Sequence, residues 1–317
     1  MQENFTKPAD FWQQRDFGKK VSATFEFIGV HWRPLGKVLL YLALPLALLQ
    51  GIMGALLQTQ VMGTIRQSMY GPGTSTSIFS RQATMYTELF QSPLYLLNNV
   101  LSVAFHAVLI LSVYGYLYYC VYPTAAGAPI TVAEVWGLVK RQFVGAFFSL
   151  YGVTIIVALG FIVLFIPGIY LGVVLSLFFA VKVLEDTGFG TTINRCVSLT
   201  SGKWWSTFGL LFIMGVIVWL LFASVGMLTV LFGGLRSLLL SSNMGPSPFL
   251  LVISAFTGLI TLLAYPPMLV AIAFQYFNLV ERKEGVGLRL LVDKLGQPEA
   301  LPDAQSSHYR PDEEGSY

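Results

Sequence analysis

The sequence predicts an all-α fold, namely a polytopic membrane helix bundle with six transmembrane helices and amphipathic helices at the membrane interface. Three observations support this prediction. Six long apolar runs follow one another, and the Lys and Arg residues between them gather in alternate connections. The composition agrees, because 55% of the residues are hydrophobic and only 11% are charged, whereas soluble domains carry about 25% charged residues.

Each apolar run can cross a bilayer as a helix. A membrane span must satisfy its own backbone hydrogen bonds, and about 20 apolar residues are needed to cross the hydrocarbon core. The predicted spans are 38–57, 100–122, 144–165, 169–184, 208–232 and 249–280. A transmembrane domain at 38–285 therefore follows an N-terminal segment, 1–37, with an interfacial helix. An amphipathic stretch and a disordered tail at 286–317 complete the chain.

The third and fourth spans are predicted as a tight hairpin. No charged residue occurs between Val144 and Val181, a stretch too long for one span. Ile166-Pro167-Gly168 lies near its centre. Proline lacks a backbone donor and glycine tolerates turn dihedrals, so we expect Pro167 and Gly168 to act as a hinge that reverses the chain.

The basic residues predict the orientation of the spans. All but three of the 19 Lys and Arg residues lie in the N-terminal segment, the second and fourth connections and the C-terminal tail. The exceptions are Arg66, Arg81 and Arg236. Basic residues near span ends stay on the cytoplasmic side. We therefore expect an inner (plasma) membrane protein with both termini in the cytoplasm.

Amphipathic segments precede three of the spans. In each, apolar residues recur at the spacing of one helix face, which is typical of interfacial helices. The segments contain Val21, Phe25, Ile28 and Trp32; Val132, Val135, Trp136, Val139 and Phe143; and Phe189, Ile193, Cys196, Val197 and Thr200. The first and third align without gaps, with Phe17 opposite Phe189 and Trp32 opposite Trp204. Two interpretations remain open: three repeats of an interfacial helix plus a transmembrane hairpin, or unrelated amphipathic linkers.

The second amphipathic segment has a defined start. Thr131-Val-Ala-Glu134 matches a capping box, in which the threonine hydroxyl and the glutamate carboxylate satisfy backbone N–H groups reciprocally. This pattern predicts a helix that begins directly after Thr131.

Small residues within the spans predict close contacts between helices. Gly51 and Gly54 lie in the first span, and Ser254 and Gly258 are separated by three residues in the sixth. Such spacing lets two membrane helices approach along their backbones.

No sequence pattern identifies a catalytic or metal site. GxGxxG, P-loop, HExxH, CxxC and GxSxG motifs do not occur in a suitable context. The three histidines, His31, His106 and His308, fall in an interfacial helix, the second span and the tail. We therefore expect no shared metal ion, no cofactor and no nucleic-acid binding.

His106 and two prolines are the candidate residues inside the membrane. Histidine deep in a span is either a functional group or a neutral side chain that hydrogen-bonds across the bundle. Pro266 and Pro267 lie in the sixth run and are expected to act as hinges, because proline removes a helix hydrogen bond. Broken helices mark substrate sites in some transporters, yet no carboxylate lies mid-membrane, which disfavours proton-coupled transport.

Motif segments in the second half resemble a known family. They are Ile166-Pro-Gly-Ile-Tyr-Leu171, Val183-Leu-Glu-Asp186, Ile193-Asn-Arg-Cys-Val-Ser-Leu-Thr-Ser-Gly-Lys-Trp-Trp205 and Tyr276-Phe-Asn-Leu-Val-Glu-Arg-Lys-Glu-Gly285. This stretch resembles the glycerophosphoryl diester phosphodiesterase membrane-domain family and related bacterial integral membrane proteins. No catalytic barrel follows Gly285, and no His and carboxylate set replaces it, so the resemblance does not imply phosphodiesterase activity.

Charged and aromatic residues of these motifs form the candidate interface site. Arg195, Lys203, Trp204 and Trp205 are predicted at the inner membrane surface, beside the acidic residues Glu185, Asp186, Glu281 and Glu284. Basic residues there can bind anionic lipid headgroups, and tryptophan anchors a helix at the headgroup level. A structural set of salt bridges with an aromatic belt is the alternative interpretation.

Three functions remain open. The first is a non-enzymatic module that interacts with or senses lipids, or scaffolds a protein partner or a homo-oligomer. The second is a transporter or channel for a small or lipidic substrate, with a path near His106 and the sixth span. The third is a lipid-modifying membrane enzyme. The absence of catalytic motifs and the abundance of interfacial helices favour the first, with membrane lipids, anionic ones among them, as partners.

Overall fold

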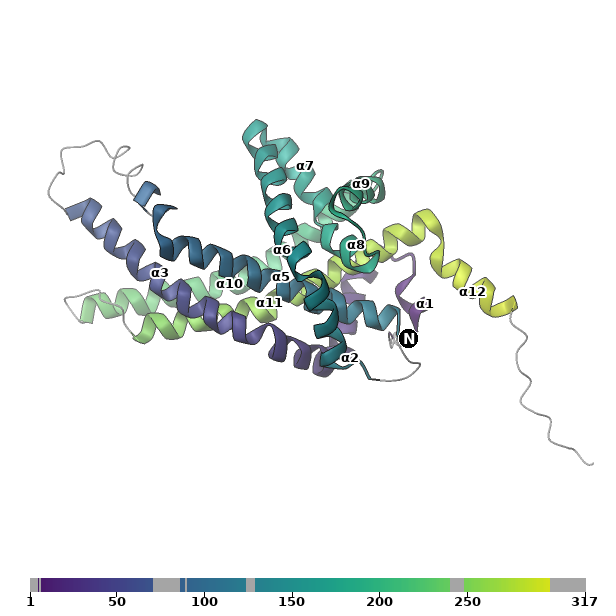
Figure 1. The fold of residues 1–317 in the computed structure, drawn as a ribbon, viewed down its shortest axis with the longest axis horizontal. Coiled ribbons are helices and arrows are strands. Elements are labelled where there is room, and N and C mark those ends of the chain that lie inside the picture. The colour runs from purple at the N-terminus through teal and green to yellow at the C-terminus, as the bar shows by residue number, and fades with distance from the viewer. Residues whose placement is uncertain are drawn as a thin grey trace, which may run out of the picture.

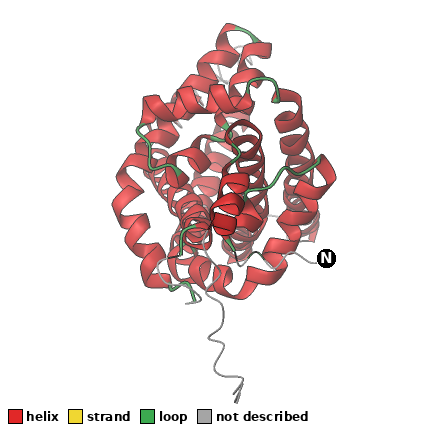
Figure 2. Ribbon diagram, turned by 90° about the vertical axis from the view of Figure 1, so that its right-hand side faces the viewer, coloured by secondary structure: helices red, strands yellow, loops and turns green. Residues whose placement is uncertain are grey.

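The computed structural model describes residues 5, 7–70, 86–88, 90–123, 129–239 and 248–296. Every regular element in these residues is a helix, which confirms the all-α prediction (Figures 1 and 2). The helices are α1 (Pro8–Phe11), α2 (Phe17–Leu42), α3 (Leu44–Tyr70), α5 (Pro93–Val121), α6 (Val132–Val163), α7 (Phe165–Leu175), α8 (Phe178–Leu184), α9 (Phe189–Thr200), α10 (Trp204–Leu239), α11 (Pro248–Glu284) and α12 (Val286–Gly296).

Six segments of the described chain are long and apolar enough to cross a membrane, which confirms the polytopic prediction. They are Leu44–Val61, Pro93–Val121, Val132–Val163, Phe165–Leu184, Trp204–Ser224 and Thr257–Glu284. The first begins later than the predicted 38–57, because α2 extends to Leu42 and α3 starts at Leu44. Pro45, in the first turn of α3, has no N–H to continue the hydrogen-bond ladder from α2.

The helices form one main bundle and one projecting hairpin. Four long helices run side by side, with contacts between α3 and α5, between α3 and α11, and between α10 and α11. α6 and α7 form a hairpin that projects away from these four helices (Figure 1). α1, α2, α8, α9 and α12 gather at the right-hand end of the bundle in Figure 1, and α1 contacts α12. The two ends of the described chain therefore meet at the same end of the molecule.

The hairpin between α6 and α7 reverses at a different residue from the predicted one. α6 ends at Val163 and α7 starts at Phe165, so the reversal lies at Leu164, which has an extended backbone (φ −159°, ψ 145°). Pro167 and Gly168 lie in the first turns of α7 instead. Proline there loses no helix hydrogen bond. Gly168 lets the helices approach, because an added Cβ would lie 2.5 Å from the Phe161 ring.

The one predicted helix start agrees with the structure. α6 begins at Val132, and Glu134 N–H donates to Thr131 Oγ1 at 3.3 Å while Thr131 N–H donates to the Glu134 carboxylate at 2.8 Å, which confirms the capping box. α2 begins at Phe17 and α9 at Phe189, the two residues that the sequence alignment pairs. The amphipathic stretch before the third span is not a separate helix, because α6 continues from it into the membrane.

α2 packs through a face that lies beside its predicted apolar stripe. Lys20, Ala23, Thr24 and Phe27 are buried against the bundle, whereas Phe25 and Trp32 are exposed. An exposed apolar stripe suits a helix that faces lipid, because its outer surface needs no protein partner. The packed face of α2 therefore combines two polar residues, Lys20 and Thr24, with apolar ones.

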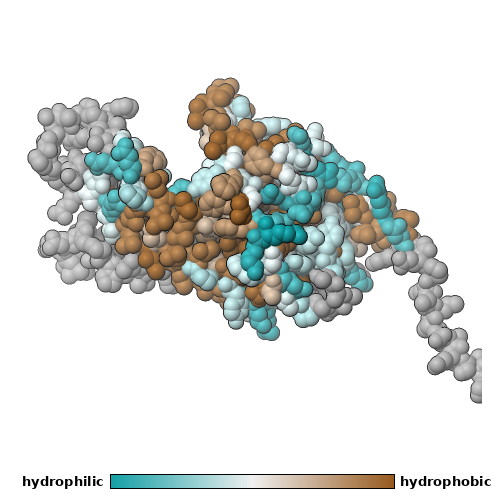
Figure 3. Space-filling view, viewed as in Figure 1, coloured by the Kyte–Doolittle hydropathy of each residue, from teal (hydrophilic) through white to brown (hydrophobic). Residues whose placement is uncertain are grey.

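Hydrophobic surface covers the parts expected in the membrane. Brown residues cover the middle of the main bundle and the tip of the α6–α7 hairpin, and teal residues gather toward the end that holds α9 and α12 (Figure 3). At the tip, Ile162 is 78% exposed and Ile166 79% exposed. Surface of this size and polarity is stable only in contact with lipid or another apolar partner. We call the polar end, which holds α9 and α12, the collar. It contains the candidate site.

Candidate functional site

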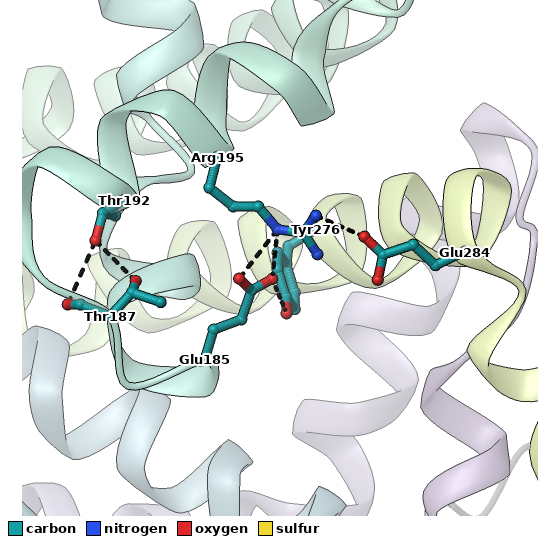
Figure 4. Close-up of polar contacts among 6 residues, drawn as sticks. All are labelled: Glu185, Thr187, Thr192, Arg195, Tyr276 and Glu284. Atoms are coloured by element: carbon teal, nitrogen blue, oxygen red, sulfur yellow. Dashed lines mark hydrogen bonds and ion pairs between the residues drawn. The ribbon is translucent and has the colours of Figure 1, made fainter.

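Arg195 lies at the centre of the collar between two carboxylates. Its Nε donates to both oxygens of Glu185 at 3.0 Å, and its guanidinium forms an ion pair with Glu284 (Figure 4). Glu185 also accepts a hydrogen bond from the Tyr276 hydroxyl at 2.9 Å. These contacts connect α8, α9 and α11, so Arg195 acts as a brace between helices.

The electrostatic environment keeps the Arg195 guanidinium charged. Hydrogen bonding to Glu284, followed by the contact with Glu185, raises the pKa of Arg195 above its usual value, against the opposite effect of burial. Two negative charges already face this cation. Arg195 is therefore poorly placed to bind an additional lipid phosphate, and the predicted headgroup role for it becomes weaker.

The turn between α8 and α9 brings Glu185 under Arg195. Asp186 has a positive φ of 48°, a conformation that asparagine and aspartate adopt more readily than most residues. Thr192 Oγ1 donates to Gly188 O at 2.7 Å and lies 2.9 Å from Thr187 Oγ1, which ties the turn to the first helical residues of α9. Figure 4 shows the two threonines beside the brace.

The end of α11 is attached to its neighbours by two further contacts. Glu281, which is buried, accepts a 2.6 Å hydrogen bond from the Gly287 N–H, and the Lys283 ammonium donates to Ser198 O. An added Cβ at Gly287 would lie 2.2 Å from Trp12 O. The start of α12 can therefore contact the N-terminal segment only because residue 287 has no side chain.

Lys20 is buried in a polar cluster that joins α2, α10 and α11. Only 2% of the residue is exposed. Its Nζ donates to Gln275 Oε1 at 2.7 Å and to Ser206 Oγ at 2.9 Å, and Gln275 Nε2 donates to Thr207 Oγ1 at 2.8 Å. The acceptors are neutral, so the ammonium is solvated by dipoles without a bound carboxylate. Burying a cation in this way is costly.

The lowered pKa of Lys20 predicts that the stability of the folded protein increases at alkaline pH. Burial lowers its pKa to about 8, assisted by the positive charges of Arg282 and Lys203, while Asp16 acts in the opposite direction. In the unfolded chain a lysine keeps a pKa of about 10.4. Between about pH 8 and pH 10 the folded protein therefore releases a proton that the unfolded chain retains, and stability rises with pH.

This prediction is checked by thermal unfolding in detergent at pH 7 to pH 10, compared with Lys20→Met. The difference between the unfolding midpoints of wild type and variant is expected to change across this range, in favour of the wild type at high pH. Parallel midpoint curves would show that Lys20 keeps its proton in the folded protein.

Lys203, Trp204 and Trp205 lie together at the start of α10. Lys203 is exposed and forms no ion pair with another described residue. The Trp204 ring stacks on Tyr170 at 6.1 Å and on Phe208 at 5.2 Å, whereas Trp205 is 77% exposed. Trp204 therefore belongs to the packing of α10, and Lys203 with Trp205 is free to contact the surroundings.

The two candidate features inside the membrane come close to each other. His106 Nδ1 lies 2.7 Å from Ser102 O on its own helix, and its ring is 5.6 Å from that of Tyr265. Tyr265 directly precedes Pro266 and Pro267, which lie inside α11. α11 runs through both prolines as one helix, so their role as hinges stays a prediction. The cavity between α6 and α7 and the cavity between α5 and α6 are lined by other residues.

His31 and His106 do not share a site. His31 Nδ1 lies 2.7 Å from the Tyr116 hydroxyl, far along the chain from the Ser102 contact of His106. His308 lies outside the described residues. In the part of the chain that the structure describes, no group of three or more His, Cys, Asp and Glu residues could hold a metal ion.

Sequence reasoning missed the polar cluster of Lys20 and the partners of Arg195. In the sequence, Lys20 is one of several basic residues before the first span, and Gln275 is a polar residue near the end of the sixth span. A polar residue such as Gln275, within an apolar run and followed shortly by Asn278, was a signal that this turn of the helix faces protein.

The comparisons with known proteins assign no family. No family model matches the chain, and neither a curated protein nor a solved structure matches it. The function is therefore inferred from the fold and the geometry of the collar.

Proposed function

We propose that this multi-pass protein resides in the inner (plasma) membrane with both termini in the cytoplasm, and that it binds lipids at its collar without acting as an enzyme. The sorting of basic residues toward the connections at this end supports the orientation. The meeting of α1 and α12 at the same end is compatible with an even number of spans. Anionic lipids are the proposed partners, because the exposed cations lie beside the membrane helices.

The observation that carries this proposal is the difference between Arg195 and Lys203. Arg195 is neutralised by Glu185 and Glu284, while Lys203 is exposed next to the exposed indole of Trp205. Lys203 also precedes the N-terminus of α10, whose unpaired N–H groups favour an anion. A cation, an indole at headgroup level and a helix N-terminus together suit a phospholipid phosphate.

Members of the quoted motifs meet in this collar, which supports the proposed relation to the phosphodiesterase membrane-domain family. Glu185 comes from the second motif, Arg195 and Lys203 from the third, and Tyr276 and Glu284 from the fourth. Contacts between three separate motif segments give a physical reason why these motif residues occur in the same chain. The relation implies a shared membrane module and no catalytic activity.

Changing Lys203 to Gln is expected to reduce the retention of anionic lipid. Purified protein in mild detergent is mixed with phosphatidylglycerol and phosphatidylcholine and examined by native mass spectrometry. One ion pair at a partly exposed interface contributes about 1 kcal/mol, which corresponds to roughly a fivefold loss of bound phosphatidylglycerol in the variant. Trp205→Ala is expected to act in the same direction.

Lys19→Gln is the matched control, since Lys19 is an exposed lysine of α2 without a neighbouring indole. Arg195→Ala is unsuitable, because it leaves two carboxylates unpaired and disturbs the fold. Equal lipid retention by wild type, the Lys203→Gln variant and the Lys19→Gln variant would contradict a headgroup site at Lys203.

A further inference from the structure

A cavity in the collar lies between the C-terminal end of α5 and the first turns of α6. Its volume is about 350 Å³, and it is lined by Tyr118, Tyr119, Tyr122, Gly137, Leu138 and Arg141. The residues occur at the spacing i, i+1, i+4 on both helices, so one face of α5 meets one face of α6. The volume is at the lower end of the range for small-molecule sites.

The cavity borders Gly137 of α6, which contributes no side chain to its wall. One turn deeper the helices touch closely, since an added Cβ at Gly115 would lie 3.3 Å from Leu138 Cδ2. At Gly137 an added Cβ would meet no atom within 4 Å. Glycine inside a helix costs about 1 kcal/mol relative to alanine, and packing between α5 and α6 does not require it here.

Three tyrosine rings form an aromatic wall. The rings of Tyr118 and Tyr119 are 5.5 Å apart at 87°, and those of Tyr118 and Tyr122 are 5.2 Å apart at 49°. All three tyrosines line the cavity, and an aromatic ring attracts an ammonium group placed over its face. Tyr119 donates to Glu134 O at 3.3 Å, which holds this wall against α6.

Two of the three tyrosine hydroxyls are available to a ligand. The hydroxyls of Tyr118 and Tyr122 form no hydrogen bond with other described residues. They are therefore available to a ligand as donors or acceptors.

Arg141 supplies the opposite charge at the rim of the cavity. Its guanidinium is 64% exposed and lies 3.7 Å from Asp186, beyond hydrogen-bond distance. Gln142 donates to the same aspartate at 2.9 Å and so holds it. Arginine binds phosphate through paired N–H groups, and most of those donors remain unused here.

We propose that the cavity binds a phosphate ester that carries an ammonium group, with the phosphate on Arg141 and the ammonium against the tyrosine rings. The inference rests on the proposed function, because a lipid headgroup is the source of this chemistry closest to a collar at the membrane surface. A zwitterionic ligand explains why a guanidinium and an aromatic wall line the same cavity. A soluble ester of the same kind has the same chemistry.

The test uses the full-length protein in detergent, titrated by calorimetry with phosphocholine and phosphoethanolamine. Gly137→Leu places a side chain at the cavity wall, where an added Cβ meets no atom within 4 Å, and is expected to weaken binding at least tenfold. Gly29→Leu is the matched control, since an added Cβ at Gly29, on α2, also meets nothing within 4 Å. Leucine has a higher helix propensity than glycine, so both variants are expected to fold.

Two further variants separate the halves of the site. Arg141→Gln is expected to weaken phosphocholine binding about tenfold, because it removes a charge-assisted hydrogen bond, and to leave binding of choline alone unchanged. Tyr118→Leu is expected to weaken both. Loss of phosphocholine binding in Gly137→Leu and Gly29→Leu alike, or no effect of Arg141→Gln, would overturn the assignment.

Nanodiscs distinguish the two sources of the ligand. Retention of phosphatidylethanolamine over phosphatidylglycerol that disappears in Gly137→Leu supports a lipid headgroup, and binding of the soluble esters without this preference supports a free ester. If neither is bound while phosphatidylglycerol retention still depends on Lys203, this inference fails and the proposed function stands. If the Lys203 dependence is absent as well, both fail.

Discussion

Replacing Gly258 by Leu is expected to lower the thermal unfolding midpoint of the protein by about 2–12 °C, since overpacking costs about 1–3 kcal/mol. An added Cβ at Gly258 would lie 2.6 Å from Ala47 O and 3.3 Å from the Ala47 carbonyl carbon. These are backbone atoms, so no side-chain rotation relieves the clash. α11 and α3 would have to separate along the main contact of the bundle.

Gly54→Leu provides the matched control for this prediction. Gly54 lies on α3, the helix that Gly258 approaches. An added Cβ at Gly54 meets no atom within 4 Å, so the close helix contact predicted at this glycine does not form. A leucine at residue 54 faces apolar surroundings in the membrane span and should leave the midpoint unchanged. Similar midpoints for the Gly258→Leu and Gly54→Leu variants, measured by light scattering or intrinsic fluorescence, would show that α3 and α11 do not approach closely at Gly258.

Replacing Arg195 by Met is expected to destabilise the protein by about 2 kcal/mol. The change removes the ion pairs to Glu185 and Glu284 and leaves two carboxylates unpaired in a part-buried site. Removing one partner of a buried pair costs about 3–5 kcal/mol, and exposure of 27% of the Arg195 side chain reduces this value because water screens the charges. The Tyr276 hydroxyl remains as a donor to Glu185.

Two variants make this prediction specific. Arg282→Met removes an arginine from the same end of the molecule, where it donates one long hydrogen bond of 3.3 Å to Asn278, and is expected to change stability by about 0.5 kcal/mol at most. The triple variant Arg195→Met, Glu185→Gln, Glu284→Gln removes the unpaired charges and should recover much of the loss. No recovery would mean that Arg195 stabilises the collar through packing and not through its charge.

The positions of the spans and of one helix start could be predicted because their causes are local. The hydrophobicity of a run of about 20 residues decides whether it crosses a bilayer. The capping box at Thr131 and Glu134 acts within one turn, and the structure shows its two hydrogen bonds. α2 and α9 begin at Phe17 and Phe189, which the alignment pairs, although no helix start was predicted at either residue.

The reversal between α6 and α7 was predicted at the wrong residue for a related reason. Pro167 and Gly168 are common turn residues, yet proline is also favourable in the first turn of a helix. Leu164 adopts the extended conformation that ends α6, two residues before the tripeptide. Which use of proline and glycine applies depends on the packing of α7 on α6, where Gly168 faces Phe161.

The sequence by itself determined that this is a six-span helical membrane protein with basic residues gathered at one side, because transfer of apolar groups and charges between water and lipid depends on each segment separately. Only the tertiary structure decided which polar residues are free. Lys20 and its acceptor Gln275 are separated by 255 positions, and Tyr276 and Glu185 by 91. Hydrogen bonds and ion pairs act over a few ångströms in space, so the same folding that neutralises Arg195 leaves Lys203 exposed and opens the cavity at Gly137.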